Sequence, residues 1–139
     1  MVVMNLRMLR IFLFLFFGAL VSAPGVVDAQ STFYVRQGAT GANNGSDWNN
    51  AYTTLPSLLV RGATYYVAAG DYGNRTFSDV ESGTATISIK KATVADHGTH
   101  TGWNDAFAQP ATFGAVVFAR DYYVFDGAYR DESRWDKAG

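Results

Sequence analysis

Residues 64–73 read TYYVAAGDYG, and this short stretch decides the class of fold that the sequence predicts. A run rich in aromatic and β-branched side chains leads directly into a glycine-containing turn, which is typical of a short β-strand. The pattern recurs along the chain. Similar strand-like segments are FYV at 33–35, ATISIK at 85–90, AVVFA at 115–119 and YYVFD at 122–126. The sequence therefore predicts a mainly β fold.

The spacing of these segments leaves two architectures open. Strand centres near residues 66, 88 and 117 are about 22 and 29 residues apart, and another strand follows about 7 residues later. Spacing in the twenties, with short strands and polar turns, is typical of coils in a parallel β-solenoid. On spacing alone, a β-sandwich with long loops fits as well.

The composition of the 139-residue chain indicates one domain and excludes several classes of function. A formal net charge of −1 gives no electrostatic case for binding nucleic acid. Because the chain has no cysteine, it has no disulfide framework, thiolate zinc site or cysteine nucleophile. Beyond residue 29 the sequence has three leucines but twelve threonines, eight tyrosines and twelve glycines, which favours sheets and turns over helical packing.

Residues 1–29 have the pattern of an export signal. Two arginines begin it, and an apolar segment at residues 11–22, IFLFLFFGALVS, leads to a small-residue cleavage site. Twelve helical residues reach about 18 Å, which is short of the roughly 30 Å bilayer core, so an uncleaved anchor is the lesser alternative. We expect cleavage after Ala29 and a secreted domain of residues 30–139, with no membrane contact after cleavage.

Two features are expected between the first strand and the strand at residue 64. Residues 37–50, QGATGANNGSDWNN, predict a surface loop with Trp48 as its large apolar anchor. Residues 53–60 predict a short helix, because their three leucines recur at helical spacing and their proline falls in the first turn.

Several of these segments together resemble a known family. The opening FYV at 33–35, the loop GANNGSDW at 41–48 and the strand YYVAAGDY at 65–72 stand in this order. They resemble the amino-terminal start of secreted right-handed parallel β-helix proteins of the pectate-lyase-like type, or pectin-lyase fold. ISIKKA at 87–92 and YYVFDG at 122–127 resemble successive coil strands of that fold.

The resemblance implies the first coils of a parallel β-helix, truncated, with the helix at residues 53–60 covering the open end of the first coil. It implies an extracellular role on polysaccharide, as a lyase, a hydrolase or a carbohydrate-binding module, and Ca²⁺ as the cofactor of such lyases. None of the family's catalytic or calcium-binding motifs can be matched here residue by residue. We therefore assign no catalytic, cofactor-binding or metal-binding residue from the resemblance.

Alternation along the predicted strands indicates which side chains face the interior. We expect stacked layers of apolar side chains, each contributing on the order of 1.5–3 kcal/mol through burial. The expected inward positions are Val67, Ile87, Ile89, Val117 and Phe125.

Residues 96–105, DHGTHTGWND, hold both histidines of the chain between two carboxylates. A metal site would need His97, His100 and a carboxylate to converge at about 2.0–2.2 Å from the ion. No helix is predicted here to present both rings on one face. We therefore expect a solvated loop anchored by Trp103, and no metal site.

The remaining charged and aromatic candidates are expected to be surface or turn residues. Alternating charges at Arg120, Asp121 and residues 130–137 predict a solvated surface. A glycosidase would need two acids about 5–9.5 Å apart, and sequence alone does not fix such a separation. The turn carboxylates in question are Asp71, Asp79 and Glu81. In each tyrosine pair, alternation leaves one ring available to stack on a sugar; the pairs are Tyr65 with Tyr66 and Tyr122 with Tyr123.

The sequence therefore predicts the amino-terminal portion of a longer extracellular β-helix protein that binds or acts on polysaccharide. This portion is expected to be non-catalytic in itself. The competing expectation is a cell-surface or adhesion scaffold without catalytic activity.

Overall fold

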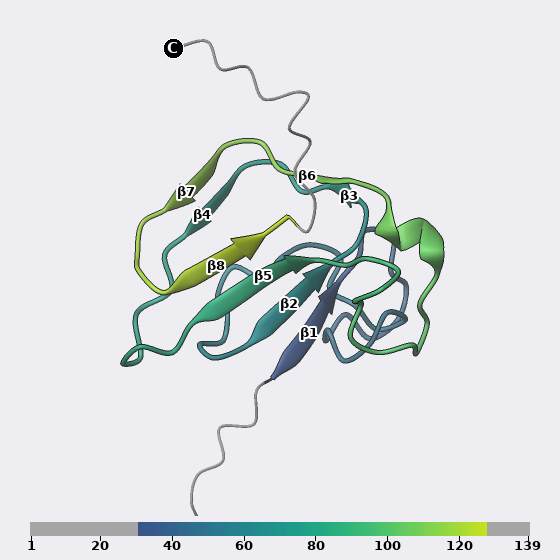
Figure 1. Cartoon of the computed structure of the whole chain (residues 1–139), viewed down its shortest axis with the longest axis horizontal. Helices are drawn as coiled ribbons and strands as arrows, with labels where there is room; N and C mark the ends of the chain where they lie inside the picture. Colours follow the sequence, from purple (N-terminus) through teal and green to yellow (C-terminus); the bar gives the residue numbers. More distant parts are fainter. Residues whose placement is uncertain (1–30, 128–139) are drawn as a thin grey trace, which may run out of the picture.

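The computed structural model describes residues 31–127, and the export signal expected at residues 1–29 lies outside them. The described chain is mainly β, with one short 3₁₀ helix, η1 (Asp105–Ala108) (Figure 1). The strands are β1 (Thr32–Val35), β2 (Thr64–Val67), β3 (Gly70–Asp71), β4 (Arg75–Phe77), β5 (Ile87–Lys91), β6 (Ala111–Thr112), β7 (Val116–Phe118) and β8 (Tyr123–Asp126).

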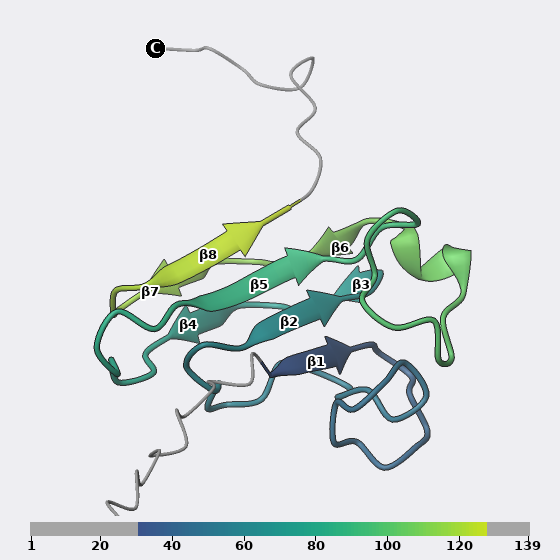
Figure 2. The ribbon, with the colours of Figure 1, turned by 60° about the horizontal axis from the view of Figure 1, so that its bottom comes forward.

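All strand pairs between these elements are parallel. Sheet A has the order β1-β2-β5-β8, and two further sheets pair β3 with β6 and β4 with β7. Three consecutive strands, β2, β3 and β4, thus pair in the same order with the next three. Figure 2 shows β1, β2, β5 and β8 side by side, with the smaller sheets behind them. This pairing differs from the antiparallel pairing of a β-sandwich.

The register of sheet A aligns like positions of successive strands. One row that faces the interior runs Phe33–Tyr65–Ile89–Phe125. The adjacent row, on the outer face, runs Tyr34–Tyr66–Lys90–Asp126. Because successive side chains of a strand point to opposite faces, each sheet position repeats its direction from strand to strand.

The interior between the sheets is apolar and confirms three of the predicted inward positions. Val67, Ile87 and Ile89 are at most 2% exposed and belong to one core cluster. Phe125 lies in register with Ile89 and its ring contacts other core aromatic rings, although the side chain is 39% exposed. Among the described residues, β8 pairs only with β5, which leaves this end of the core partly open.

The predicted inward position of Val117 is wrong. Its side chain is 50% exposed, whereas Val116 packs against the core and Phe118 stacks on Phe77 with ring centres 5.1 Å apart. Because β7 alternates about Val117, the inward positions are its two neighbours.

The capping helix predicted over residues 53–60 is absent. These residues form bends and extended backbone instead of helical turns. Leu55 and Leu59 are nevertheless buried in the core, while Leu58 is 77% exposed. The leucines therefore supply apolar cover at this end of the core without helical geometry.

Long-range hydrogen bonds replace the hydrogen bonds of that helix. The guanidinium of Arg75 donates to three consecutive carbonyl groups, those of residues 55–57. The Leu59 N–H donates to the carboxylate of Asp79 at 2.6 Å. Since the backbone groups are satisfied by side chains from β4 and the residues after it, local helical spacing does not decide the conformation.

The edge of β1 that faces away from β2 is covered by the loop that follows it. Val35 forms a parallel bridge with Tyr52, and the Tyr34 N–H donates to the carbonyl of Gly45 at 3.0 Å. Gly45 has φ +72°, and a Cβ there would lie 2.4 Å from the Tyr52 ring. Trp48 is fully buried, which confirms its predicted role as the anchor of this loop.

Candidate functional site

The outer face of sheet A carries a polar hollow of about 350 Å³. Its lining comes from two aligned rows of side chains on β2, β5 and β8. The hollow is lined by Thr64, Ser88 and Val124 in one row and Tyr66, Lys90 and Asp126 in the other. Hydroxyl, ammonium and carboxylate groups thus stand close together beside one aromatic ring.

Asp96, from the loop after β5, ties two members of the second row together. The Tyr66 hydroxyl donates to Asp96 Oδ1 at 2.7 Å, and Lys90 Nζ donates to Asp96 Oδ2 at 2.5 Å. Lys90 Nζ also lies 5.7 Å from the centre of the Tyr66 ring. The three side chains therefore hold one another in place at the edge of the hollow.

The electrostatics of this group fix its protonation states at neutral pH. The hydrogen bond to Asp96 raises the pKa of Lys90, and the hydrogen bonds from Lys90 and Tyr66 lower the pKa of Asp96. Desolvation, with the hydrogen bond to Asp96, raises the pKa of Tyr66 to about 12. Lys90 stays protonated, Asp96 ionised and Tyr66 neutral, so the group suits hydrogen bonding to a ligand better than proton abstraction.

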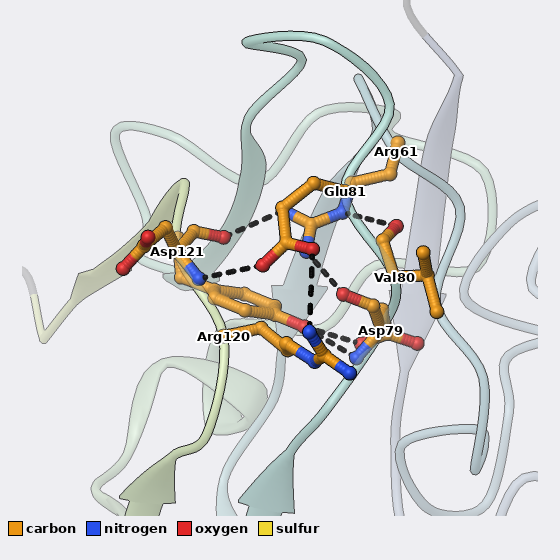
Figure 3. Close-up of polar contacts among 7 residues, drawn as sticks. Arg61, Asp79, Val80, Glu81, Arg120 and Asp121 are labelled. Atoms are coloured by element: carbon orange, nitrogen blue, oxygen red, sulfur yellow. Dashed lines mark hydrogen bonds and ion pairs between the residues drawn. The ribbon is translucent and has the colours of Figure 1, made fainter.

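A second polar cluster joins three turns at one end of sheet A (Figure 3). Arg61, just before β2, donates to the carbonyl oxygens of Asp79 and Val80, which follow β4. The same guanidinium donates to the carbonyls of Asp121 and Tyr122 at 2.8 and 3.0 Å, between β7 and β8. Arg61 thus crosslinks three segments of backbone that are distant in sequence.

The carboxylates of this cluster are engaged in the same structural contacts. Asp79 is only 5% exposed; besides the Leu59 N–H, its carboxylate accepts a hydrogen bond from the Tyr123 hydroxyl at 2.8 Å. Glu81 accepts a hydrogen bond from the Asp121 N–H at 3.3 Å and lies 3.8 Å from Arg120. The structure therefore gives Asp79 and Glu81 roles in joining turns.

The other predicted candidates separate as alternation suggests. Tyr65 is buried and Tyr66 faces the hollow, while Tyr122 is 45% exposed and Tyr123 packs against the core. Asp71 is the exposed last residue of β3, and its carboxylate accepts a hydrogen bond from the Gly73 N–H just after the strand. The charged segment at residues 130–137 lies outside the described residues.

Residues 96–104 form a loop anchored by Trp103, as expected from the sequence, and all of them except His97 are exposed or half-buried. Within this loop the two histidines lie together. His97 is only 7% exposed, and its Nε2 lies 3.0 Å from His100 Nδ1. Its ring stacks on Trp103 with ring centres 4.1 Å apart. Within residues 31–127, no group of three or more His, Cys, Asp or Glu side chains is placed to hold a metal ion.

The link between Asp96 and the outer-face row was not found from the sequence. Alternation places Ser88 and Lys90 on one face and leaves one of Tyr65 and Tyr66 exposed, but it does not show that these strands pair to form a hollow. The approach of Asp96 depends on the path of the loop after β5, which no local pattern specifies.

Comparison with models of known families, with curated proteins and with solved structures finds no match to this chain. Across residues 31–127, none of the helical structure has the length and apolar character needed to cross a bilayer.

Proposed function

We propose that residues 31–127 are the first coils of a right-handed parallel β-helix in an exported protein, and that its outer face binds carbohydrate without catalysing a reaction. The parallel, in-order pairing of β2, β3 and β4 with β5, β6 and β7 supports the coil assignment. Among residues 31–127, β8 has a partner strand on one side only, as the outermost coil of such a stack does. The pattern of residues 1–29 supports export.

The polar hollow on sheet A is the observation that carries the binding proposal. Sugars present several hydroxyl groups around an apolar ring, so they are recognised by a few polar groups placed beside an aromatic surface. The hollow combines such groups: the Ser88 and Thr64 hydroxyls, the Lys90 ammonium and the Tyr66 ring. The protonation states of Tyr66, Lys90 and Asp96 favour binding over acid–base catalysis.

Affinity gel electrophoresis against neutral and acidic polysaccharides tests this proposal, with the secreted domain of residues 30–139 as the sample. We expect at least one polysaccharide to retard the protein. Lys90→Ala, which removes a donor, and Ser88→Phe, which fills the hollow, should each weaken binding at least tenfold. Arg120→Gln is the matched control, because Arg120 is exposed and does not line the hollow.

The outcomes separate the two classes of function. Retardation of the wild type that is lost in the hollow variants supports carbohydrate binding at this face. Equal retardation of all four proteins, or none with any polysaccharide, would contradict it and favour the scaffold alternative. Release of unsaturated or reducing ends by this domain, with or without Ca²⁺, would contradict the non-catalytic part of the proposal.

A further inference from the structure

The contact between His97 and His100 has a geometry that differs from that of a simple hydrogen bond. The two ring nitrogens are 3.0 Å apart, and the ring centres are 4.7 Å apart. A straight N–H···N bond at this separation would place the ring centres about 5.3 Å apart, because each nitrogen lies about 1.15 Å from its ring centre. At least one ring is therefore turned away from the line that joins the two nitrogens.

The separation of the two nitrogens suits two ligands of one metal ion. Imidazole nitrogen binds divalent zinc at about 2.0–2.1 Å. Two nitrogens 3.0 Å apart, each at that distance from one ion, subtend an angle of about 95° at the ion, which corresponds to neighbouring positions of a square-planar or tetragonal site.

The surroundings of His97 prepare its Nε2 to act as a ligand. Its Nδ1 lies 3.1 Å from the carbonyl oxygens of both Thr93 and Val94. A carbonyl oxygen only accepts, so Nδ1 carries a proton, and the corresponding neutral tautomer has its lone pair on Nε2. In the metal-free contact the His100 Nδ1–H then donates to His97 Nε2, and a metal ion would take the place of that proton. A metal-ligating histidine usually donates its second N–H to a carbonyl or carboxylate in this way.

The backbone between the two rings is also constrained. Gly98 has φ +69°, and a Cβ at this position would lie 2.5 Å from the Tyr34 hydroxyl oxygen. That hydroxyl accepts a hydrogen bond from the Thr99 N–H at 2.9 Å. The turn that brings the rings together is thus held by β1 and excludes side chains at its centre.

We propose that His97 Nε2 and His100 Nδ1 form a two-nitrogen site for a divalent late transition metal, with Cu²⁺ preferred. Cu²⁺ favours tetragonal nitrogen sites and stands highest in the usual order of affinities for such ligands. His100 is exposed, so water or an external ligand completes the coordination from the solvent side. The site is independent of the carbohydrate proposal, since neither histidine lines the hollow.

A Cu²⁺ titration of the untagged secreted domain tests the site, with tryptophan fluorescence as the readout. The Trp103 ring stacks on His97, and Trp48 lies 5.1 Å from Trp103 between ring centres, so bound Cu²⁺ should quench emission in a saturable way. Electron paramagnetic resonance of the one-to-one complex should show coupling to two imidazole nitrogens.

His100→Ala is the decisive variant, because it removes one ligand at an exposed position and leaves the contacts of His97 with residues 93 and 94 in place. We expect it to weaken Cu²⁺ binding at least tenfold with unchanged circular dichroism. Asp121→Asn, which alters an exposed carboxylate just before β8, should bind as the wild type does. Absence of saturable binding, or equal affinity of wild type and His100→Ala, would overturn the proposal.

Discussion

Replacing Asp79 with alanine should strongly destabilise the domain, because this buried carboxylate joins three segments. It accepts a hydrogen bond from the Leu59 N–H at 2.6 Å and another from the Tyr123 hydroxyl at 2.8 Å. The Asp79 N–H in turn donates to the Tyr123 oxygen at 2.8 Å. The side chain thus holds the non-helical segment before β2 and the start of β8 against the end of β4.

The size of the effect follows from the groups left without a partner. A hydrogen bond to a charged acceptor contributes about 1.5–3 kcal/mol, and a buried donor left unsatisfied costs about 1–3 kcal/mol. The Leu59 N–H is buried and the Tyr123 hydroxyl is partly so, which gives a loss of about 3–4 kcal/mol. Domains of this size are stable by about 5–15 kcal/mol, so Asp79→Ala should remain folded but with much less reserve.

Urea unfolding at pH 7, followed by near-ultraviolet circular dichroism, measures this loss. With a slope of about 1–3 kcal/mol per molar urea, the midpoint should fall by about 1–4 M. Asp121→Asn is the matched control, because its side chain is exposed and its contacts to Arg61 and Glu81 use the backbone. A loss below 1 kcal/mol for Asp79→Ala, or an equal loss for the control, would refute the assigned role.

Two further changes test the interior. Ile87→Asp should unfold or aggregate the protein, because Ile87 is fully buried. The control Ser88→Asp changes the outer face and should express and melt normally. Equal yields and melting profiles for the two variants would contradict the inward assignment of Ile87. Burial lowers the pKa of Lys91 to about 8. Between about pH 8 and 10.5 the unfolded chain therefore binds the extra proton, and the free energy of unfolding contributed by Lys91 should rise with pH across this window. Urea midpoints of the wild type, measured from pH 7 to 11, should show that rise, and those of Lys91→Met should lack the contribution of Lys91. Superimposable pH profiles of the two proteins would contradict the lowered pKa of Lys91.

The period-two pattern made most of the sheet predictable. Ile87, Ile89 and Val67 are buried as alternation requires, because each strand has one face in the core and one outside. Val117 was misassigned because three apolar residues in a row give no alternation to read. The pairing of β7 with β4 decides which of these three side chains face the core. The sequence of β7 alone does not contain that information.

The features that the sequence did not predict depend on contacts between distant residues. Helical spacing at residues 53–60 is overridden by Arg75, whose guanidinium reaches the carbonyls that a helix would have paired internally. The approach of His97 to His100 depends on the turn at Gly98, held against Tyr34 from β1. Spacing within a segment cannot reveal partners that lie 20 to 65 residues away.

The order of sheet A has a consequence for how the molecule opens. In a sheet whose strands pair only with their neighbours, different regions open with different free energies. β5 has a partner strand on each side, while among residues 31–127 β8 has one. Amide protons of β8 should therefore exchange through local fraying, well before those of β2 and β5, whose exposure requires neighbouring strands to separate. Protection against hydrogen exchange would then grade across sheet A, so that among residues 31–127 the strand with a single partner is also the one that opens most readily.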